Sequence, residues 1–169
     1  MQRVALLSDT HVPSRADRIP AWVLDRIEAA DAVIHAGDFD SREALSTVQS
    51  VAPDRFVAVA GNMDPGRLDL PRVGTLDVAD VRFVVTHGTG PPGTYSERVY
   101  NTAAERAGPG ETVGIAGHTH DVLDTSVKGI RLCNPGSATG APPAREATMM
   151  ECDVTGSEIE VRVLSAESD

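Results

Sequence analysis

Residues 4–11 read Val-Ala-Leu-Leu-Ser-Asp-Thr-His, a short apolar run that ends in a polar cluster. An uninterrupted apolar run of this length predicts a strand that is buried on both faces. The pattern returns at residues 32–38 and 56–62, which end in Gly-Asp and Gly-Asn. Two predicted helices separate these runs: residues 20–30 have apolar residues near helical spacing, and Ser41 with Ala44 indicates the start of a helix over 41–50. The first part of the chain therefore predicts a β-α-β-α-β unit with parallel strands.

The remainder of the chain favours hairpins. Pairs of apolar runs are joined by short turns at 75–78 with 81–85, 122–126 with 130–133, and 147–154 with 158–164. One more helix is expected at 95–107, before a buried strand at 112–116. We expect two sheets packed face to face with helices outside. The length of 169 residues suits a single domain over residues 1–169.

Composition limits the partners of the chain. Asp and Glu number 25 against 15 Lys and Arg, which gives a formal net charge of -10. Such a surface repels phosphate backbones, so no nucleic-acid polymer is expected as a partner, although a local cation would still hold a small anion. Cys133 and Cys152 lack the spacing of a disulfide framework or a thiolate zinc site. A reducing, cytoplasmic setting is expected, with no signal peptide and no membrane span.

Seven polar side chains follow five of the predicted strands directly, and all are of types that bind metals: Asp9, His11, Asp38, Asn62, His87, His118 and His120. Each alone has an ordinary explanation as a helix cap, a turn residue or a surface histidine. Because the carboxyl ends of parallel strands meet at one edge of a sheet, the set predicts a metal site there. We expect Gly117 to allow a sharp exit from its strand, and His118 and His120 to diverge onto neighbouring ions.

The chain resembles a known family at this point. The segments Asp9-Thr10-His11, Gly37-Asp38, Gly61-Asn62, His87-Gly88 and Gly117-His118-Thr119-His120 resemble, in order and spacing, the five motifs of the calcineurin-like metallophosphoesterases. The short loops and the Asn-Pro-Gly-Ser segment at 134–137 are similar to the small YfcE-type phosphodiesterase branch. The resemblance implies a four-layer α/β/β/α sandwich of two mixed sheets flanked by helices. It also implies a phosphodiesterase that hydrolyses small phosphodiesters through a hydroxide activated by two metals.

The resemblance further implies the ligands of each metal. Asp9, His11, Asp38 and His120 would bind one ion, and Asp38, Asn62, His87 and His118 the other, with Asp38 bridging. Mixed nitrogen and oxygen ligands suit two divalent transition-metal ions, with Mn as the first expectation and Ni, Fe, Zn or Co as alternatives. Asn62 and His87 are also candidates for contacting the substrate.

One position departs from the family pattern. Many members carry a histidine after the Gly-Asn pair as a general acid, whereas this chain has Met63, which transfers no proton. Asp64 is the nearest alternative donor, and it is equally explained as a turn residue before Pro65. We therefore expect better activity on activated diesters than on alkyl monoesters. His35 is expected behind the metal ligands or in packing. Asn134 either reaches the site through its loop or begins a turn with Pro135, and we favour the turn.

Alternative functions remain open at this stage. A retromer subunit shares the fold and acts as a non-catalytic scaffold, and other relatives are phosphomonoesterases or nucleases. The complete set of ligand residues favours an enzyme, and the lack of a basic patch disfavours a nuclease. The sequence does not rank substrates such as cyclic nucleotides, and it leaves a homo-oligomer as an alternative to a monomer.

Overall fold

In the computed structural model, which describes residues 1–167, the strands form two five-stranded sheets. The first sheet has the order β10-β9-β1-β2-β3 and consists of β1 (Gln2–Leu7), β2 (Ala32–His35), β3 (Phe56–Ala58), β9 (Thr148–Thr155) and β10 (Glu158–Ser165). The second has the order β4-β5-β6-β8-β7 and consists of β4 (Val73–Val78), β5 (Val81–Thr86), β6 (Glu111–Ile115), β7 (Val122–Val127) and β8 (Ile130–Pro135). The helices are α1 (Ala21–Glu28), α2 (Arg42–Val51) and α3 (Tyr95–Glu105), with short 3-10 turns η1 (Gly66–Leu68) and η2 (Pro92–Thr94).

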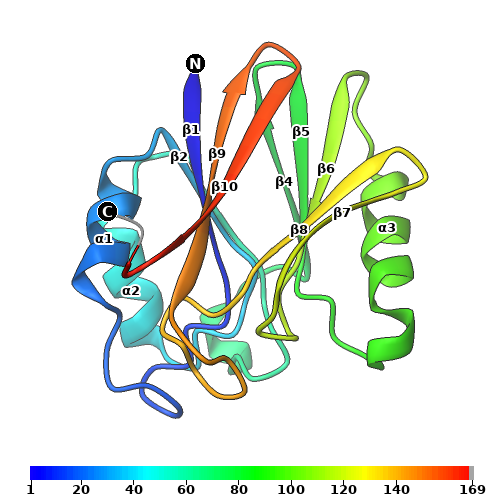
Figure 1. The fold of residues 1–169 in the computed structure, drawn as a ribbon. Coiled ribbons are helices and arrows are strands. Elements are labelled where there is room, and N and C mark those ends of the chain that lie inside the picture. Colours follow the sequence, from blue (N-terminus) through cyan, green and yellow to red (C-terminus); the bar gives the residue numbers. More distant parts are fainter. Residues whose placement is uncertain (168–169) are drawn as a thin grey trace.

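The two sheets pack face to face, with α1 and α2 outside the first sheet and α3 outside the second (Figure 1). Side chains alternate along β1, so that Val4 and Leu6 enter the apolar cluster between the sheets while Ala5 and Leu7 enter the cluster under α1 and α2. A third apolar cluster includes Val99 on α3. Three apolar layers separate four layers of secondary structure, and the expected α/β/β/α sandwich is confirmed.

The strand pairing agrees with much of the sequence analysis. Strands β1, β2 and β3 are parallel, and the expected hairpins β4-β5, β7-β8 and β9-β10 are antiparallel. The second sheet differs from the expectation of hairpins alone, because β5, β6 and β8 pair in parallel. Strand β9 also joins the first sheet beside β1. Hydrophobic periodicity reports which faces of a strand are buried and not which strand lies beside it.

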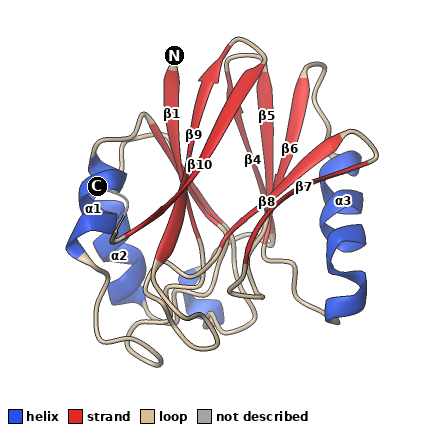
Figure 2. Cartoon of the chain, viewed as in Figure 1, coloured by secondary structure: helices blue, strands red, loops and turns tan. Residues whose placement is uncertain are grey.

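The carboxyl ends of β1, β2, β3, β5 and β6 lead into one region. The Asp9 amide donates to the Gly37 carbonyl at 2.9 Å, and the Gly117 amide donates to the His87 carbonyl at 3.1 Å. Figure 2 shows the loops gathered at this end of the sandwich. Within residues 1–167, none of the helices has the length and apolar character needed to cross a bilayer.

Helix α2 begins where the sequence predicted. The Ser41 side chain accepts a hydrogen bond from the Ala44 amide at 3.1 Å, which caps the helix and ends the loop that carries Asp38. Helix α2 thereby fixes the far end of this loop.

Candidate metal centre

The structure brings all seven candidate ligands together at the carboxyl ends of the strands. Among these seven, two groups have ligand atoms within 4.8 Å of one another, Asp9 with His11 and His120, and Asp9 with Asp38 and His87. These five residues are buried. The remaining two lie toward the surface, where His118 Nδ1 is 3.0 Å from Asn62 Oδ1 and the His118 amide donates to Asp9 Oδ2 at 3.0 Å.

Hydrogen bonds behind the site fix three of the imidazoles. His11 Nδ1 lies 2.9 Å from an oxygen of Asp40, His87 Nδ1 lies 2.7 Å from the carbonyl of Ala36, and His120 Nδ1 lies 2.7 Å from the carbonyl of Ala141. Because each partner is an acceptor, each Nδ1 carries the proton and each Nε2 presents a lone pair to the cluster. Metal-binding histidines are held in this way.

The lone pairs in the cluster face one another. His11 Nε2 lies 3.1 Å from His120 Nε2, and both nitrogens are acceptors when their Nδ1 atoms carry the protons. Among the described residues, Asp9 Oδ1 and His87 Nε2 are buried with no hydrogen-bond partner. Such acceptors are costly to bury unless a cation lies between them. This set of carboxylate oxygens and imidazole nitrogens therefore fits divalent transition metals.

The charges of the cluster also favour a cation. Burial raises the pKa of Asp9, but the adjacent imidazoles of His11, His120 and His87 outweigh it and hold that pKa below its usual range. Burial lowers the pKa of His87, but the nearby carboxylates of Asp38 and Asp9 and the Ala36 carbonyl together outweigh it, so the pKa is raised. The carboxylates are thus negative at neutral pH and draw positive charge to the imidazoles.

The backbone is left-handed at five of the seven positions. The φ angles are positive at Asp9 (53°), His11 (46°), Asp38 (62°), His118 (72°) and His120 (62°). Residues with side chains rarely adopt this conformation, which costs roughly 1–3 kcal/mol each and gathers at functional sites. The concentration of strain marks these loops as a site by a criterion independent of residue type.

Two glycines make room for the cluster. A Cβ atom at position 117 would overlap Ser8 Oγ and lie 2.5 Å from Asp9 Oδ2, and one at position 61 would lie 2.5 Å from the Asp38 amide. We expected glycine at position 117 because its backbone freedom would allow a sharp turn after the strand, and this explanation is wrong. The residue is needed because the ends of the two sheets approach closely, and the left-handed turns fall on the histidines that follow it.

The His118-Thr119-His120 segment diverges as the spacing suggested. The His120 ring stacks on His11 with centroids 4.9 Å apart, and its Nε2 lies 3.3 Å from Asp9 Oδ1. The His118 ring instead meets the edge of His87 at 5.2 Å. The two imidazoles of the segment thus face different groups of candidate ligands.

Asp64 does not have the surroundings of a proton donor. Its two oxygens accept hydrogen bonds from the amides of Asp38 (2.8 Å), Phe39 (2.7 Å), Asp40 (3.0 Å) and Gly61 (2.8 Å). With its oxygens used as acceptors for N–H groups, the side chain ties the loop after β2 to the loop after β3. We assign it this positioning role and withdraw it as a general acid.

Asn134 does more than begin a turn. It lies buried at the end of β8, and its Nδ2 is within hydrogen-bond distance of Tyr95 Oη (3.0 Å), the Gly117 carbonyl (3.0 Å) and Thr119 Oγ1 (2.9 Å). Its Oδ1 accepts from the Gly136 amide at 2.9 Å, which is the turn contact that we expected. The preference for a turn alone was wrong, because tertiary contacts use the other end of the same amide.

His35 lies behind the ligands, as predicted. Its Nδ1 accepts from the Gly37 amide at 3.1 Å, its Nε2 is 2.7 Å from Thr10 Oγ1, and its ring stacks on Phe39 with centroids 3.6 Å apart. Complete burial lowers the pKa of His35 to about 3, so the ring is neutral at physiological pH.

Sequence reasoning missed several supporting residues. Asp40, which holds His11, lies in the same polar segment as Asp38. The sequence could therefore have suggested it as the hydrogen-bond partner of a metal-binding histidine. Tyr95 donates to the Gly117 carbonyl at 2.7 Å, and Ala141 holds His120 through its carbonyl. A backbone carbonyl carries no signal in residue identity, so the role of Ala141 was not accessible from the sequence.

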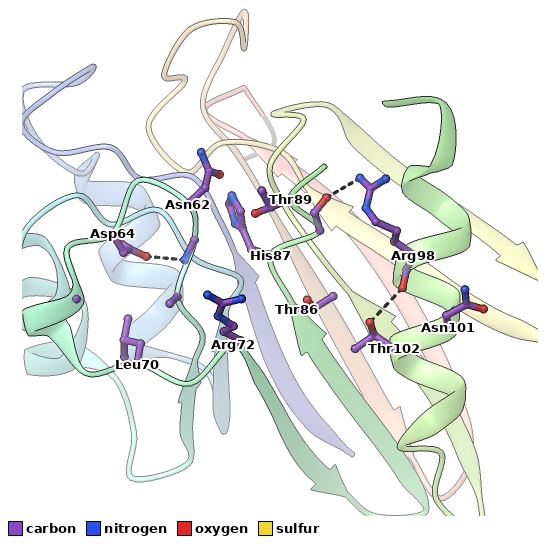
Figure 3. Close-up of a pocket in the computed structure, with 14 residues that line it drawn as sticks. Asn62, Asp64, Leu70, Arg72, Thr86, His87, Thr89, Arg98, Asn101 and Thr102 are labelled. Carbon is purple, nitrogen blue, oxygen red and sulfur yellow. Dashed lines mark hydrogen bonds between the residues drawn. The ribbon is translucent and has the colours of Figure 1, made fainter. Parts of the chain in front are cut away.

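A cavity of about 740 Å³ opens beside the cluster (Figure 3). Asn62 and His87 belong to its lining, which connects it to the candidate ligands. Arg72 and Arg98 also line it, and neither was singled out by the sequence. The space is large enough for the organic part of a small substrate.

Comparison with known proteins gives one family. Residues 2–157 match the calcineurin-like phosphoesterase superfamily domain. A probable metallophosphoesterase of Methanocaldococcus jannaschii is 36% identical over 138 residues, covering 80% of this chain and 68% of that protein. A probable metallophosphoesterase of Methanothermobacter thermautotrophicus is 29% identical over 162 residues, covering 95% and 91%. A phosphodiesterase of M. jannaschii is 26% identical over 155 residues, covering 82% and 85%.

Solved structures share the fold. Vps29 from Chaetomium thermophilum superposes with a TM-score of 0.79 at 19% identity, covering 98% of this chain and 97% of that chain. A conserved uncharacterized protein from Streptococcus pneumoniae gives a TM-score of 0.75 at 24% identity, covering 99% and 91%. At these identities the likeness concerns the fold alone.

Proposed function

We propose that this chain, which belongs to the calcineurin-like phosphoesterase superfamily, is a phosphodiesterase that acts on small phosphodiesters with two divalent metal ions. Metal-dependent phosphoester hydrolysis follows from the family. The preference for diesters, the presence of two ions and manganese as the first metal are parts of the proposal. The phosphodiesterase of M. jannaschii among the relatives supports the preference for diesters.

The observation that carries the proposal is the set of opposed acceptors in the cluster. Asp38 Oδ2 lies 3.5 Å from His11 Nε2 and 3.1 Å from His87 Nε2, between the two groups of candidate ligands. This supports Asp38 as the shared ligand. We assign to one ion Asp9, His11, Asp38 and His120, and to the other Asp38, Asn62, His87 and His118.

The protein would orient the substrate at this edge. Bound metals of this kind neutralise phosphoryl oxygens and make water acidic enough to attack at neutral pH. The imidazoles of His11, His87 and His120 are each held from behind through Nδ1. Asn62 and His87 belong both to the cluster and to the lining of the cavity. A phosphodiester with its organic part in the cavity would therefore place its phosphorus at the cluster.

The expected leaving group follows from Met63. Its side chain is 46% exposed, and its amide donates to Asp38 Oδ1 at 2.8 Å, so an apolar group lies at the rim next to the site. Met63 has no proton to give, and the oxygens of Asp64 are used by backbone amides. Leaving groups that depart without protonation, such as aryl oxides, should be favoured over alkoxides.

Metal analysis and a substrate panel test the proposal. Chelated protein should be inactive on an aryl phosphodiester, and manganese should restore activity with about two ions per chain. Hydrolysis that survives full chelation contradicts the metal-dependent mechanism. An alkyl monoester should react much more slowly, and equal turnover of the two esters contradicts the assignment of Met63.

A non-catalytic scaffold is the second candidate, favoured by the fold shared with Vps29. The same panel separates the two functions. Protein that binds its metals but hydrolyses none of the aryl or alkyl esters would support the scaffold.

A further inference from the structure

The cavity beside the cluster carries positive charge on a chain whose formal net charge is -10. Arg72, just before β4, and Arg98, on α3, contribute to its lining. Asp64 adds one negative charge to the lining, but its oxygens already accept hydrogen bonds from backbone amides. Asn62 and His87 line the same space, so the arginines and the candidate metal ligands face one continuous cavity (Figure 3). A local cationic wall on an acidic protein indicates an anionic ligand.

Arg72 is free to bind a ligand. Its side chain is exposed, and within residues 1–167 it forms no hydrogen bond or ion pair. By contrast, the half-buried Arg82 pairs with Asp77 at 2.7 Å. An unpaired guanidinium at the lining of a cavity offers all its N–H groups to an incoming anion.

Arg98 is a fixed charge by comparison. Its Nη1 donates to the Pro91 carbonyl at 2.8 Å and to Thr94 Oγ1 at 2.6 Å, and its Nη2 donates to the Gly88 carbonyl at 2.9 Å. These partners are neutral, so they position the guanidinium without cancelling its charge. The group is therefore preorganised for a negative ligand.

The rest of the lining suits an organic molecule with polar groups. Thr86, Thr89 and Asn101 add hydroxyl and amide groups, while Ala60 and Leu70 add apolar surface. Figure 3 places Leu70 across the cavity from Asn101 and Arg98, with Arg72 between them. The cavity thus offers apolar contacts for carbon atoms and donors for an anion.

On the basis of the proposed phosphodiesterase function, we infer that the substrate carries a second phosphate on the organic part that occupies this cavity, and that Arg72 and Arg98 bind it. One guanidinium already satisfies the two oxygens of a carboxylate through a paired contact. Two guanidinium groups with hydroxyl and amide neighbours match the greater charge and the three terminal oxygens of a phosphomonoester. The substrate class is a phosphodiester that bears an additional phosphomonoester.

A pair of chromogenic diesters tests the inference. Thymidine 5′-(p-nitrophenyl phosphate) and its 3′-phosphorylated form differ only by the second phosphate. We expect manganese-loaded protein to favour the 3′-phosphorylated form in kcat/KM, and Arg72→Gln to lower the ratio of the two values by at least about fivefold. Arg72→Lys should keep most of the ratio because it keeps the charge. Arg106→Gln is the matched control, since it removes an exposed arginine next to α3 and outside the cavity.

An unchanged ratio in Arg72→Gln would overturn the inference, whether the two kcat/KM values stay the same or fall equally. Equal loss would assign Arg72 to the reacting phosphate, which both probes carry. Arg98 is less suitable for substitution because it also anchors the loop that follows His87.

Equilibrium binding provides a readout without turnover. Calorimetry with the full chain, chelated and manganese-loaded, should show thymidine 3′,5′-bisphosphate binding at least about fivefold more tightly than thymidine 5′-monophosphate, and Arg72→Gln should remove the difference. Equal affinities in the unaltered chain contradict the second-phosphate site while leaving the diesterase function standing. Tighter bisphosphate binding without metal-dependent hydrolysis of either diester contradicts the diesterase function instead.

Discussion

The metal cluster and the cavity beside it are adjacent and are built by opposite means. The cluster uses short side chains on left-handed strand-end loops, and a hydrogen bond from behind holds each buried imidazole. The cavity relies on long side chains, one of which, Arg72, is exposed and unpaired among the described residues. In the function that we propose, the reaction chemistry would belong to the cluster, and the choice of substrate to surface side chains of the cavity.

The largest effect is expected from removing the shared carboxylate. Asp38→Asn keeps the size of the side chain and an acceptor for the Met63 amide but removes the charge. We expect loss of at least one metal by elemental analysis and a fall in kcat/KM of more than about 100-fold, since outer partners of metal ligands alone cost 10–100-fold. Asp54→Asn, at an exposed position, is the control. Full occupancy of both sites in Asp38→Asn would contradict its assignment as the bridge.

The rigidity of the cluster is tested at Asp40, which contacts the candidate ligand His11 and is not itself a candidate ligand. Asp40→Asn keeps an acceptor near His11 Nδ1 but removes the negative charge behind the ring. Metal affinity, measured by competition with a chelator, should fall about tenfold, while circular dichroism stays unchanged. Unaltered affinity would show that the carboxylate of Asp40 does not tune His11.

The close approach of the two sheets predicts a stability effect. Gly117→Ala adds a methyl group that overlaps Ser8 Oγ, so we expect a loss of about 1–3 kcal/mol in the free energy of unfolding by urea titration. Gly93→Ala is the matched control, because a Cβ there meets nothing within 4 Å. Equal stability of the two variants would mean that the loops separate at little cost.

The smallest effect concerns pH and His35. Its folded pKa of about 3 lies below the usual value of 6.5, so the unfolded chain binds a proton between these limits that the folded chain does not. The contribution to stability therefore falls as pH falls below 6.5, by at most about 1.4 kcal/mol per pH unit. In metal-free protein, the stability of His35→Gln should depend less on pH between 6 and 4.5 than that of the unaltered chain. Parallel pH profiles would contradict the burial of a neutral ring.

The sequence predicted the cluster better than the cavity for a physical reason. Asp9, Asp38 and His118 follow buried apolar runs, and parallel strands bring such ends together. The role of Asn134 depended on Tyr95 and Thr119, which reach it only through the packing of α3 and the loop after β6. The cavity depends on long side chains whose meeting depends on loop paths, and no periodicity encodes those paths.

Strand order was also beyond the sequence. The runs at β5, β6 and β8 are apolar in the way that buried strands are, and this property does not distinguish a hairpin neighbour from a parallel one. The two-sheet arrangement was predictable because three separate apolar faces require burial.

The Asp64 carboxylate has a consequence for how the two ions would load. It holds the amides of Asp38 and Gly61 at 2.8 Å each, so the loop of the shared ligand and the loop of Asn62 are ordered together. An ion that immobilises the first loop already meets part of the entropy cost of ordering the second. Binding of the two ions would then be cooperative. Asp64 would couple the two sites although it belongs to neither assigned set of ligands.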